Sequence, residues 1–336
     1  MPDEIKVCIY LELEKTTSRS GIGAAVRNQI QSLKNENIKL ASNKYALDYD
    51  IIHINSIGPK SLFLANIAKA AGKKVILHAH TTGEDFIDSY HFSDRVAPWL
   101  RRYLQRFYNL GDIVLCPSEY TRSLLEKYGI KKEIKVISNG VNISRFENIN
   151  DIRDEYREKY DLNGIVPFCV GHVFAKKGVE TFINLAHQFP GYRFLWFGTI
   201  YKKLVQKRTT DMIKKSPGNC IFTGYIKNIV HAYAGGDIFI FPSYDENQGI
   251  VILEAAAAKK PIIVRDIPTY CGWLEDGKDC LKAKDDEEFS QHLQYLIDNP
   301  GECKRLSENS YKMVQSHDMS LIGHELVQIY RSVLER

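Results

Sequence analysis

Two glutamates and a glycine are the residues of this sequence whose types and spacing most directly suggest chemistry. Glu246 and Glu254 lie eight positions apart in DENQGIVILEAAAAKKP, and Gly249 precedes the apolar run. The strand-like IFIF before this stretch and the alanines after it place Gly249 at a helix N-terminus, where unpaired backbone N–H groups bind phosphates. Glu254 in the second turn leans back toward that end and can accept hydrogen bonds from a ribose. If Glu254 is considered without the rest of the stretch, the alternative is that its carboxylate only interacts favourably with the helix dipole and binds no ligand.

Two further stretches place polar groups directly after apolar runs. In VGHVFAKKGVETF, His172 and Lys177 follow the run that ends at Val170. In VILHAHTTGEDF, His78 and His80 are two residues apart and share one face if the strand continues. A solvated lysine at a helix start and a structural histidine are the alternatives at these positions.

The elements that must position these residues alternate between short β-branched runs and amphipathic helical patterns, which is typical of parallel α/β units. The first half predicts strands over 5–11, 50–55, 74–78, 113–116 and 134–138 and helices over 22–35, 60–71, 94–108 and 119–128. A polar linker follows over 141–164, and strands resume over 166–171, 192–198, 219–224, 237–243 and 261–266. The predicted fold class is therefore α/β, with two doubly wound parallel sheets whose carboxyl strand ends carry the candidate residues.

Length and composition agree with this organisation and exclude several classes of protein. The 336 residues favour two domains, predicted over 1–160 and 161–318, with a helix over 319–336 that can cross back to the first domain. Seven scattered cysteines without a C-x-x-C pair indicate reduced thiols in the cytosol. No apolar run is long enough to cross a bilayer, and the acidic N-terminus is unlike a signal peptide. A net charge of +4 is too small to imply nucleic acid as a partner.

The stretch with Glu246 and Glu254 resembles the E-x7-E motif of glycosyltransferase family 4, and the resemblance extends over nearly the whole chain. Members of this family are retaining enzymes of the GT-B fold, in which two Rossmann-like domains face a central cleft. The resemblance implies that Glu246 is a catalytic residue beside the donor sugar and that Glu254 binds the ribose of the nucleotide. It assigns the residues between them to donor binding as well: Asn247, Gln248, Gly249 and Ile250.

Other positions match the family in the same chain order. VGHVFAKKGVETF looks like the family's G-R-x4-K-G element, which implies that Lys177 binds the diphosphate and assists catalysis. The sequence departs at His172, a donor-binding position where the family has arginine, so one fixed positive charge is missing or depends on pH. Gly21 and Gly23 in SRSGIGAAVRNQI match the glycine loop that faces the donor phosphates. His80 resembles the first-domain histidine that approaches the donor sugar and the hydroxyl of the acceptor substrate, which makes it a catalytic candidate.

The clue to the acceptor substrate is SDRVAPWLRRYLQRFYNLGD. On a helical wheel, Arg95, Arg102 and Arg106 line one face with Trp99, as in helices that bind anionic lipid headgroups. The alternative is that this helix faces only solvent and binds no lipid. YLELEKTTSRSGIGAAVRNQIQSL, IIHINSIGPKS and HAHTTGEDFIDSY are similar to bacterial glycosyltransferases that extend diacylglycerol glycolipids. That similarity implies transfer of glucose or galactose from a UDP-hexose to a monoglycosyl-diacylglycerol by a cytoplasmic enzyme that attaches to the anionic inner face of the cell membrane.

Three other functions stay open at this point. They are a soluble family 4 enzyme of capsular or other polysaccharide synthesis, a nucleotide-sugar epimerase, and a partner subunit whose donor site has decayed. No cofactor and no obligatory metal are expected. Asp48 and Asp50 form a D-x-D pair, which binds metal in other nucleotide-sugar enzymes, but this pair precedes its strand and lies at the wrong end of the sheet. His78 and His80 would need His53 as a third ligand to hold zinc.

Overall fold

The computed structural model describes residues 4–17, 20–34, 36, 38–84, 93–201 and 207–336, without the side chains of 15, 16 and 93–98. The chain divides into two compact units. The first unit contains the described residues of Met1–Ile87, Asp94–Val141 and His317–Arg336, and the second contains Asn142–Ser316 together with Ser93, the described residue of Asp88–Ser93. Each unit is built on its own six-stranded sheet.

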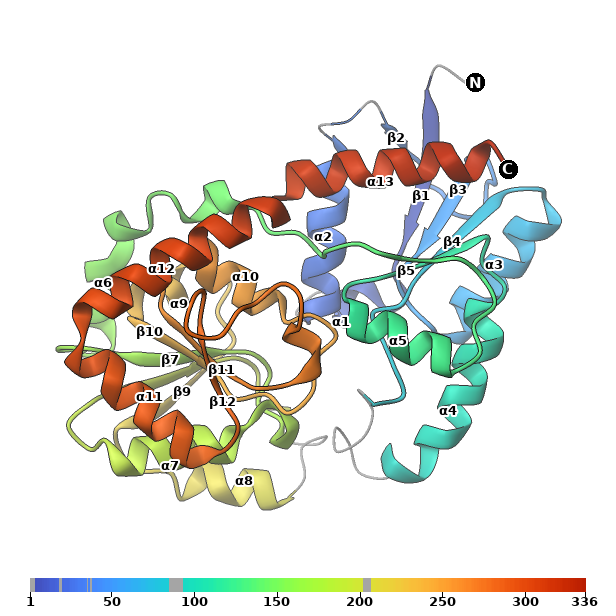
Figure 1. The fold of residues 1–336 in the computed structure, drawn as a ribbon. Helices are drawn as coiled ribbons and strands as arrows, with labels where there is room; N and C mark the ends of the chain where they lie inside the picture. Colours follow the sequence, from blue (N-terminus) through green and yellow to red (C-terminus); the bar gives the residue numbers. More distant parts are fainter. Residues whose placement is uncertain (1–3, 18–19, 35, 37, 85–92, 202–206) are drawn as a thin grey trace. The chain divides into compact units, whose positions relative to one another are not determined.

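The first unit is a parallel sheet with the strand order β2-β1-β3-β4-β5-β6 (Figure 1). Its strands are β1 (Ile5–Tyr10), β2 (Ile38–Leu40), β3 (Ile51–Ile54), β4 (Lys74–His78), β5 (Ile113–Cys116) and β6 (Ile134–Val136). Its helices are α1 (Glu14–Thr17), α2 (Gly21–Lys34), α3 (Pro59–Ala70), α4 (Ser93–Tyr108), α5 (Glu119–Lys127) and α13 (Met319–Leu334). The central strands are apolar on both faces because helices cover both sides of a doubly wound sheet.

The C-terminal helix α13 is part of the core of the first unit. Ile322, Leu326 and Tyr330 are buried in the same hydrophobic cluster as Ile51 and Ile76 of the central strands. Figure 1 shows α13 crossing α2, with which it is in contact. The helix begins at the cap of Asp318, whose carboxylate accepts a hydrogen bond from the Ser320 N–H.

The second unit repeats this architecture with the strand order β12-β11-β10-β7-β8-β9, again all parallel (Figure 1). Its strands are β7 (Pro167–Val170), β8 (Phe194–Phe197), β9 (Cys220–Gly224), β10 (Ile238–Phe241), β11 (Ile262–Arg265) and β12 (Leu281–Ala283). Its helices are α6 (Arg153–Lys159), α7 (Val179–Gln188), α8 (Lys207–Lys214), α9 (Val230–Gly235), α10 (Ile250–Ala257), α11 (Asp286–Asp298) and α12 (Pro300–Val314). The predicted fold class, two doubly wound parallel sheets, is confirmed.

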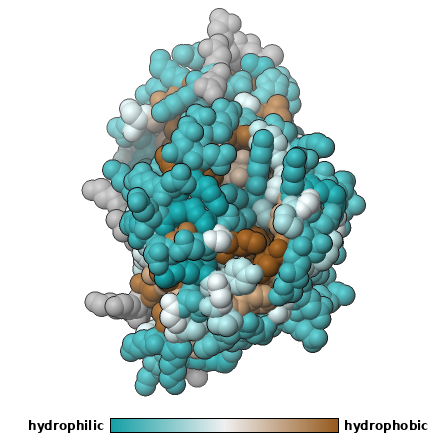
Figure 2. Space-filling view, turned by 90° about the vertical axis from the view of Figure 1, so that its left-hand side faces the viewer, coloured by the Kyte–Doolittle hydropathy of each residue, from teal (hydrophilic) through white to brown (hydrophobic). Residues whose placement is uncertain are grey.

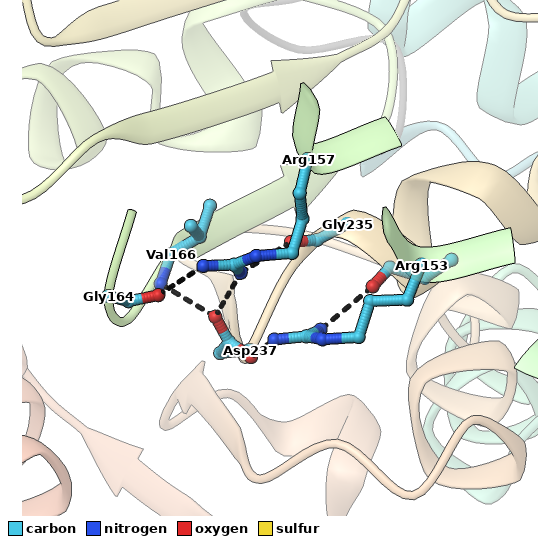
Figure 3. A network of polar contacts seen from close by, with 7 residues as sticks. Arg153, Arg157, Gly164, Val166, Gly235 and Asp237 are labelled. Carbon is cyan, nitrogen blue, oxygen red and sulfur yellow. Dashed lines mark hydrogen bonds and ion pairs between the residues drawn. The ribbon is translucent and has the colours of Figure 1, made fainter. Parts of the chain in front are cut away.

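The polar segment after Val141 belongs to the second unit because two arginines of α6 attach it there. Arg153 and Arg157 both pair with the carboxylate of Asp237, at 2.5 and 3.1 Å, and Asp237 also accepts from the Val166 N–H (Figure 3). Arg153 donates in addition to the carbonyl of Ala234 at the end of α9. The sequence prediction put the domain boundary at residue 160, after α6, because the charged composition of this segment suggested a solvated linker. In the structure the unit begins before α6.

Three short elements were not predicted: β2, β12 and α1. Each has only three or four residues, and β2 and β12 are the outermost strands on their side of each sheet. An edge strand of this length needs little apolar sequence, since it pairs on one side only. The strands for which bounds were predicted, the helices α2, α3, α4 and α5 and the C-terminal helix α13 lie within a few residues of those bounds.

The described surface contains no helix that is both long and apolar enough to cross a membrane. On the face shown in Figure 2, hydrophilic residues predominate, and hydrophobic side chains gather in one hollowed area near its centre.

Candidate functional site

The segment between β10 and α10 has the geometry predicted for a phosphate-binding helix start. Gly249 has φ +83°, a left-handed conformation that side chains disfavour, and α10 begins at the next residue, Ile250. Ile250 and Gln248 are buried and Asn247 is half-buried, so this segment is ordered against the second unit. The N–H groups at the start of a helix have no carbonyl four residues earlier within the helix, which is the arrangement that binds anions. In α10 the Ile252 N–H donates to the Gly249 carbonyl oxygen at 2.9 Å, so the N–H groups of Ile250 and Val251 are the ones that we expect to face an anion.

Glu254 lies in the second turn of α10 and is held by a tyrosine that sequence reasoning missed. The hydroxyl of Tyr233, on α9, lies 2.8 Å from Oε2 of Glu254 and 3.1 Å from the carbonyl oxygen of Val251. Both side chains are buried, and burial together with the negative charge of Glu254 raises the pKa of Tyr233 well above its usual value. Tyr233 therefore stays protonated and donates to the carboxylate, which fixes its orientation.

A tight turn that only glycine permits brings Lys177 to the carboxyl end of the second sheet, where α10 begins. Gly178 has φ +76°, and a Cβ at this position would lie 2.2 Å from the carbonyl oxygen of Pro242. The carbonyl of Lys176 accepts a hydrogen bond from the Tyr244 N–H at 2.8 Å. The loop after β7 and the loop after β10 are thus packed backbone to backbone, at the carboxyl ends of adjacent strands.

Lys177 and Glu246 form an ion pair between these two loops. Both side chains are largely buried, with 19% and 11% of their surface exposed, and Lys177 also lies 5.6 Å above the ring of Phe241. The Thr269 hydroxyl donates to the backbone carbonyl of Glu246 at 2.7 Å and holds its loop from the other side. The arrangement presents one cation and one carboxylate together beside the start of α10.

His172 lies between β7 and the Lys177 turn and does not supply a positive charge near neutral pH. Burial, and next the positive charge of Lys177, lower the pKa of His172 from 6.5 to about 4. Its ring packs edge-on against Tyr201, with 5.1 Å between ring centroids, and against Phe174. Of the two alternatives for this position, the structure therefore favours a missing positive charge near neutral pH, and Lys177 is the cation that the geometry places beside Glu246.

In the first unit, Gly21 and Gly23 lie inside the first turn of α2 rather than in a loop before it. The hydroxyl of Ser20 accepts a hydrogen bond from the Gly23 N–H at 3.3 Å, as a helix cap does. A Cβ on Gly21 would meet no atom within 4 Å, so the open space in front of the helix lies at Gly21. These glycines still form a helix N-terminus after β1, as the sequence predicted.

His80 follows β4 and belongs to a buried group of three histidines. Its ring stacks on that of His78 with 3.9 Å between centroids, and Nε2 of His53 lies 3.2 Å from Nδ1 of His78. Nε2 of His80 donates to Oδ1 of Asn55 at 2.9 Å. Within the described residues, no group of three or more histidine, cysteine or acidic side chains is arranged to hold a metal ion.

The buried histidines predict that the protein loses stability in mild acid. Burial, and next the charge of His80, lower the pKa of His53 from 6.5 to about 3. Below about pH 6.5 the imidazole of His53 therefore binds a proton in the unfolded chain but not in the folded chain. The free energy of unfolding falls as the pH drops through this range. His53 alone is expected to lower the free energy of unfolding by about 2 kcal/mol between pH 7 and pH 5. Urea denaturation at both pH values measures this change.

The matched variants for that measurement are His53→Gln and His187→Gln. His187 is exposed on α7, so its replacement is expected to leave the pH dependence as it is. His53→Gln lowers stability at pH 7 but reduces the further loss between pH 7 and pH 5. An unchanged loss in His53→Gln would contradict the assignment to this residue.

The helix α4 has the amphipathic arrangement predicted for its described side chains. Leu104 and Phe107 are buried in the core of the first unit, whereas Arg102 and Arg106 are exposed and Trp99 is 71% exposed. The guanidinium of Arg102 lies 5.9 Å from the centre of the Trp99 ring. The side chain of Arg95, which was placed on the same face, lies outside the described residues.

Asp48 and Asp50 hold the start of a strand, as the sequence predicted for the D-x-D pair. Asp48 forms an ion pair with Lys6 at 2.5 Å, and Asp50 accepts from the backbone N–H of Lys6 at 2.8 Å. Both contacts lie at the amino ends of β1 and β3, away from the carboxyl ends that carry the candidate residues.

Comparison with known proteins matches each unit to a glycosyltransferase family model. Residues 26–145 match the model of Glycosyltransferase Family 4, and residues 152–313 match that of Glycosyl transferases group 1. The chain is 33% identical over 338 residues to the processive diacylglycerol alpha-glucosyltransferase of Acholeplasma laidlawii, covering 98% of this chain and 99% of that protein. It is 23% identical to the alpha-galactosylglucosyldiacylglycerol synthase of Streptococcus pneumoniae, covering 99% of this chain and 90% of that protein.

Solved structures agree on the fold. The crystal structure of HepE from Anabaena in complex with UDP-glucose is similar with a TM-score of 0.82 and 18% identity, covering 98% of this chain and 100% of that one. Sucrose-phosphate synthase from Thermosynechococcus elongatus is similar with a TM-score of 0.82 and 16% identity over 99% of both chains. A relative that is 33% identical over nearly the whole chain, together with the two family models, shows that the chain belongs to glycosyltransferase family 4, and the solved structures show that it has the GT-B fold.

Proposed function

We propose that this protein is a retaining hexosyltransferase that moves glucose or galactose from a UDP-sugar to a monoglycosyl-diacylglycerol. The observation that carries the proposal is the meeting of Lys177, Glu246 and the start of α10, with Glu254 one turn further along the helix. The acceptor class is supported by the two relatives that match nearly the whole chain, because both are named for diacylglycerol glycolipids.

In this proposal the second unit binds UDP and stabilises its departure. The N–H groups of the first turn of α10 and the ammonium of Lys177 bind the diphosphate, whose negative charge grows as the bond to the sugar breaks. Glu254 accepts the two ribose hydroxyls. Glu246 pairs with Lys177 when no donor is bound, and beside a bound donor its carboxylate binds sugar hydroxyls and stabilises positive charge on the ring.

The transfer itself needs one bond broken and one formed on the same face of the sugar. The bond between C1 of the hexose and the β-phosphate oxygen breaks, and the acceptor hydroxyl oxygen bonds to C1. The proton of that hydroxyl passes to the departing phosphate oxygen, so no additional base is required. Glu246 is the carboxylate that we place beside the sugar, and it acts on charge rather than as a covalent nucleophile.

The test of this proposal uses labelled UDP-glucose and, separately, labelled UDP-galactose. The protein is incubated with anionic vesicles that contain either plain diacylglycerol or its monoglucosyl derivative, and the lipids are then extracted into organic solvent. Label in the organic phase with the monoglucosyl lipid is the expected result, and it identifies the donor as well. Label that stays in water while UDP still binds would contradict the lipid acceptor and favour a polysaccharide acceptor.

We further propose that α4 attaches the enzyme to the inner face of the cell membrane. Arg102 and Arg106 are exposed beside Trp99, and an arginine near an anionic bilayer contributes about 1 kcal/mol. The double replacement by glutamine is therefore expected to weaken binding to anionic vesicles roughly 30-fold, at about 2 kcal/mol. Vesicle sedimentation measures the binding, and UDP affinity is expected to stay unchanged.

The matched control removes two exposed charges elsewhere. Lys214 and Lys215 are exposed at the end of α8 in the second unit, and their double replacement by glutamine changes the net charge equally. If the two double variants weakened vesicle binding equally, net charge alone would govern that binding. Full binding after loss of Arg102 and Arg106 would contradict α4 as the membrane site.

A further inference from the structure

The amino end of the second sheet carries a cluster of charged side chains that the donor site does not use. Asp237 directly precedes β10, and its carboxylate accepts hydrogen bonds from Arg153 at 2.5 Å and from Arg157 at 3.1 Å (Figure 3). Lys260 lies two residues before β11, which pairs with β10, and the register of the two strands places Lys260 directly beside Asp237. This edge of the sheet is opposite to the edge that carries the candidate donor residues.

Lys260 is a buried cation without a partner in the described part of the chain. The residue is only 9% exposed, and its ammonium makes no hydrogen bond or ion pair with a described residue. The charged groups that act on it are Asp237, Arg153 and Arg157, of which the two arginines repel it. An ammonium that has lost water costs free energy unless another group pairs with it.

Asp237 is not free to be that partner. Its two carboxylate oxygens already accept from both arginines and from the Val166 N–H at 2.9 Å, and its ion pairs are with the arginines. Three cations therefore meet one carboxylate, which leaves a surplus of two positive charges. Nε of each arginine also has no acceptor among the described residues, so it can donate together with the ammonium of Lys260.

The first turn of α12 lies close to the same cluster and adds no negative charge. Burial, and next the charge of Asp237, raise the pKa of the Cys303 thiol to about 11. Cys303 therefore stays neutral near pH 7, and its Sγ donates to the carbonyl oxygen of Leu296. The surplus positive charge is thus left for a group from outside the chain.

We propose that Lys260, Arg153 and Arg157 form a binding site for a phosphate group, carried by a small soluble molecule or by a lipid headgroup. A phosphate has a charge of roughly −1.5 to −2 at pH 7, which matches the surplus of two positive charges. Its oxygens accept charge-assisted hydrogen bonds from ammonium and guanidinium groups. A bound phosphate connects α6, which carries both arginines, to the segment between α10 and β11 and thereby stabilises the second unit.

The first experiment uses inorganic phosphate as the probe. Thermal unfolding is followed against phosphate concentration at constant ionic strength, with saturating UDP so that the proposed diphosphate site is occupied. We expect a saturable rise of Tm in the unaltered protein and an at least tenfold weaker phosphate affinity in Lys260→Met, which lacks one charge-assisted donor. The general stabilising effect of phosphate on proteins is expected to be equal in both and does not saturate in the same range.

The same variant gives a second result of opposite sign without phosphate. Methionine has a similar length and no charge, so Lys260→Met removes an unpaired ammonium and its repulsion from two arginines. We expect its Tm in chloride alone to be equal to or higher than that of the unaltered protein. A lower Tm in chloride, with an unchanged response to phosphate, would make Lys260 a structural partner of Asp237 and would overturn the inference.

A control variant and a second probe identify the source of the phosphate group. Lys312→Met removes the same charge from the exposed surface of α12 and is expected to keep the full phosphate response. Sedimentation with vesicles that contain phosphatidic acid compares the same two variants. Weaker vesicle binding by Lys260→Met alone would assign the site to a lipid headgroup, and a difference in the phosphate titration alone would assign it to a soluble molecule. No difference between the two variants in either assay would overturn the inference. Neither assay requires sugar transfer, so the result is independent of the proposed function.

Discussion

Replacing Glu246 with glutamine is expected to lower turnover of the UDP-sugar about 100- to 1000-fold while UDP affinity changes by less than about threefold. Glutamine keeps the size of the side chain and the backbone contact with Thr269, but it removes the charge that pairs with Lys177 and that we propose to lie beside the sugar. Loss of one electrostatic stabiliser in a site shielded from water has an effect of that size on kcat. Lys177 without its partner stays available to the diphosphate, so UDP binding is preserved.

Steady-state kinetics and UDP titration calorimetry together measure this separation of turnover from binding. Glu275→Gln is the matched control, because Glu275 forms an ion pair with Lys278 on the exposed surface of the same unit. It is expected to leave both quantities unchanged. Normal turnover in Glu246→Gln would remove Glu246 from the catalytic residues, and a large loss of UDP affinity would assign it to nucleotide binding instead.

Replacing Glu254 with alanine is expected to weaken UDP binding at least about 100-fold. Two hydrogen bonds from ribose hydroxyls to a carboxylate are lost, and each such bond contributes roughly 1.5–3 kcal/mol. The hydroxyl of Tyr233 also loses its charged partner, although the carbonyl of Val251 stays within 3.1 Å. Tyr233→Phe keeps the carboxylate but frees its orientation, so a smaller loss of a few-fold is expected.

Thermal or urea unfolding with UDP gives this affinity without an assay of transfer. A ligand at about 100 times its dissociation constant adds about 2.7 kcal/mol to stability, and a 100-fold weaker ligand at the same concentration adds about 0.4 kcal/mol. Glu287→Ala, an exposed replacement on α11, is the control that should retain the full stabilisation. Unchanged stabilisation of Glu254→Ala by UDP would exclude Glu254 from the nucleotide site.

Much of the second unit's candidate site could be predicted from short stretches because its residues are positioned by local rules. A glycine before an apolar helix places Gly249 and the start of α10, and a glycine after Lys177 permits the turn that reaches Pro242. The spacing of Glu246 and Glu254 then follows from the loop and one helical turn. The contact between Lys177 and Glu246 follows from the adjacency of β7 and β10, which sequence alone suggests only through the fold class.

The residues that sequence reasoning missed are held by partners far away along the chain. Tyr233 reads as an ordinary buried aromatic of a short helix, and its hydrogen bond to Glu254 depends on how α9 packs on α10. Asn55 and Gln29 have no motif, and Tyr330 lies 277 residues from its partner His53. Periodicity marks all of them as buried, but it gives no information on which polar atoms meet.

The place of α13 in the core of the first unit also sets the order in which the two units can be completed during synthesis. The second unit is contained in Asn142–Ser316 and has all its strands once those residues have left the ribosome. The sheet of the first unit emerges earlier, but Leu326, Tyr330 and Val333 must arrive before its apolar face is covered. Domains usually fold from the N-terminus onward. In this chain the first unit to emerge is the last to be finished, and its uncovered face is the surface that a chaperone would meet.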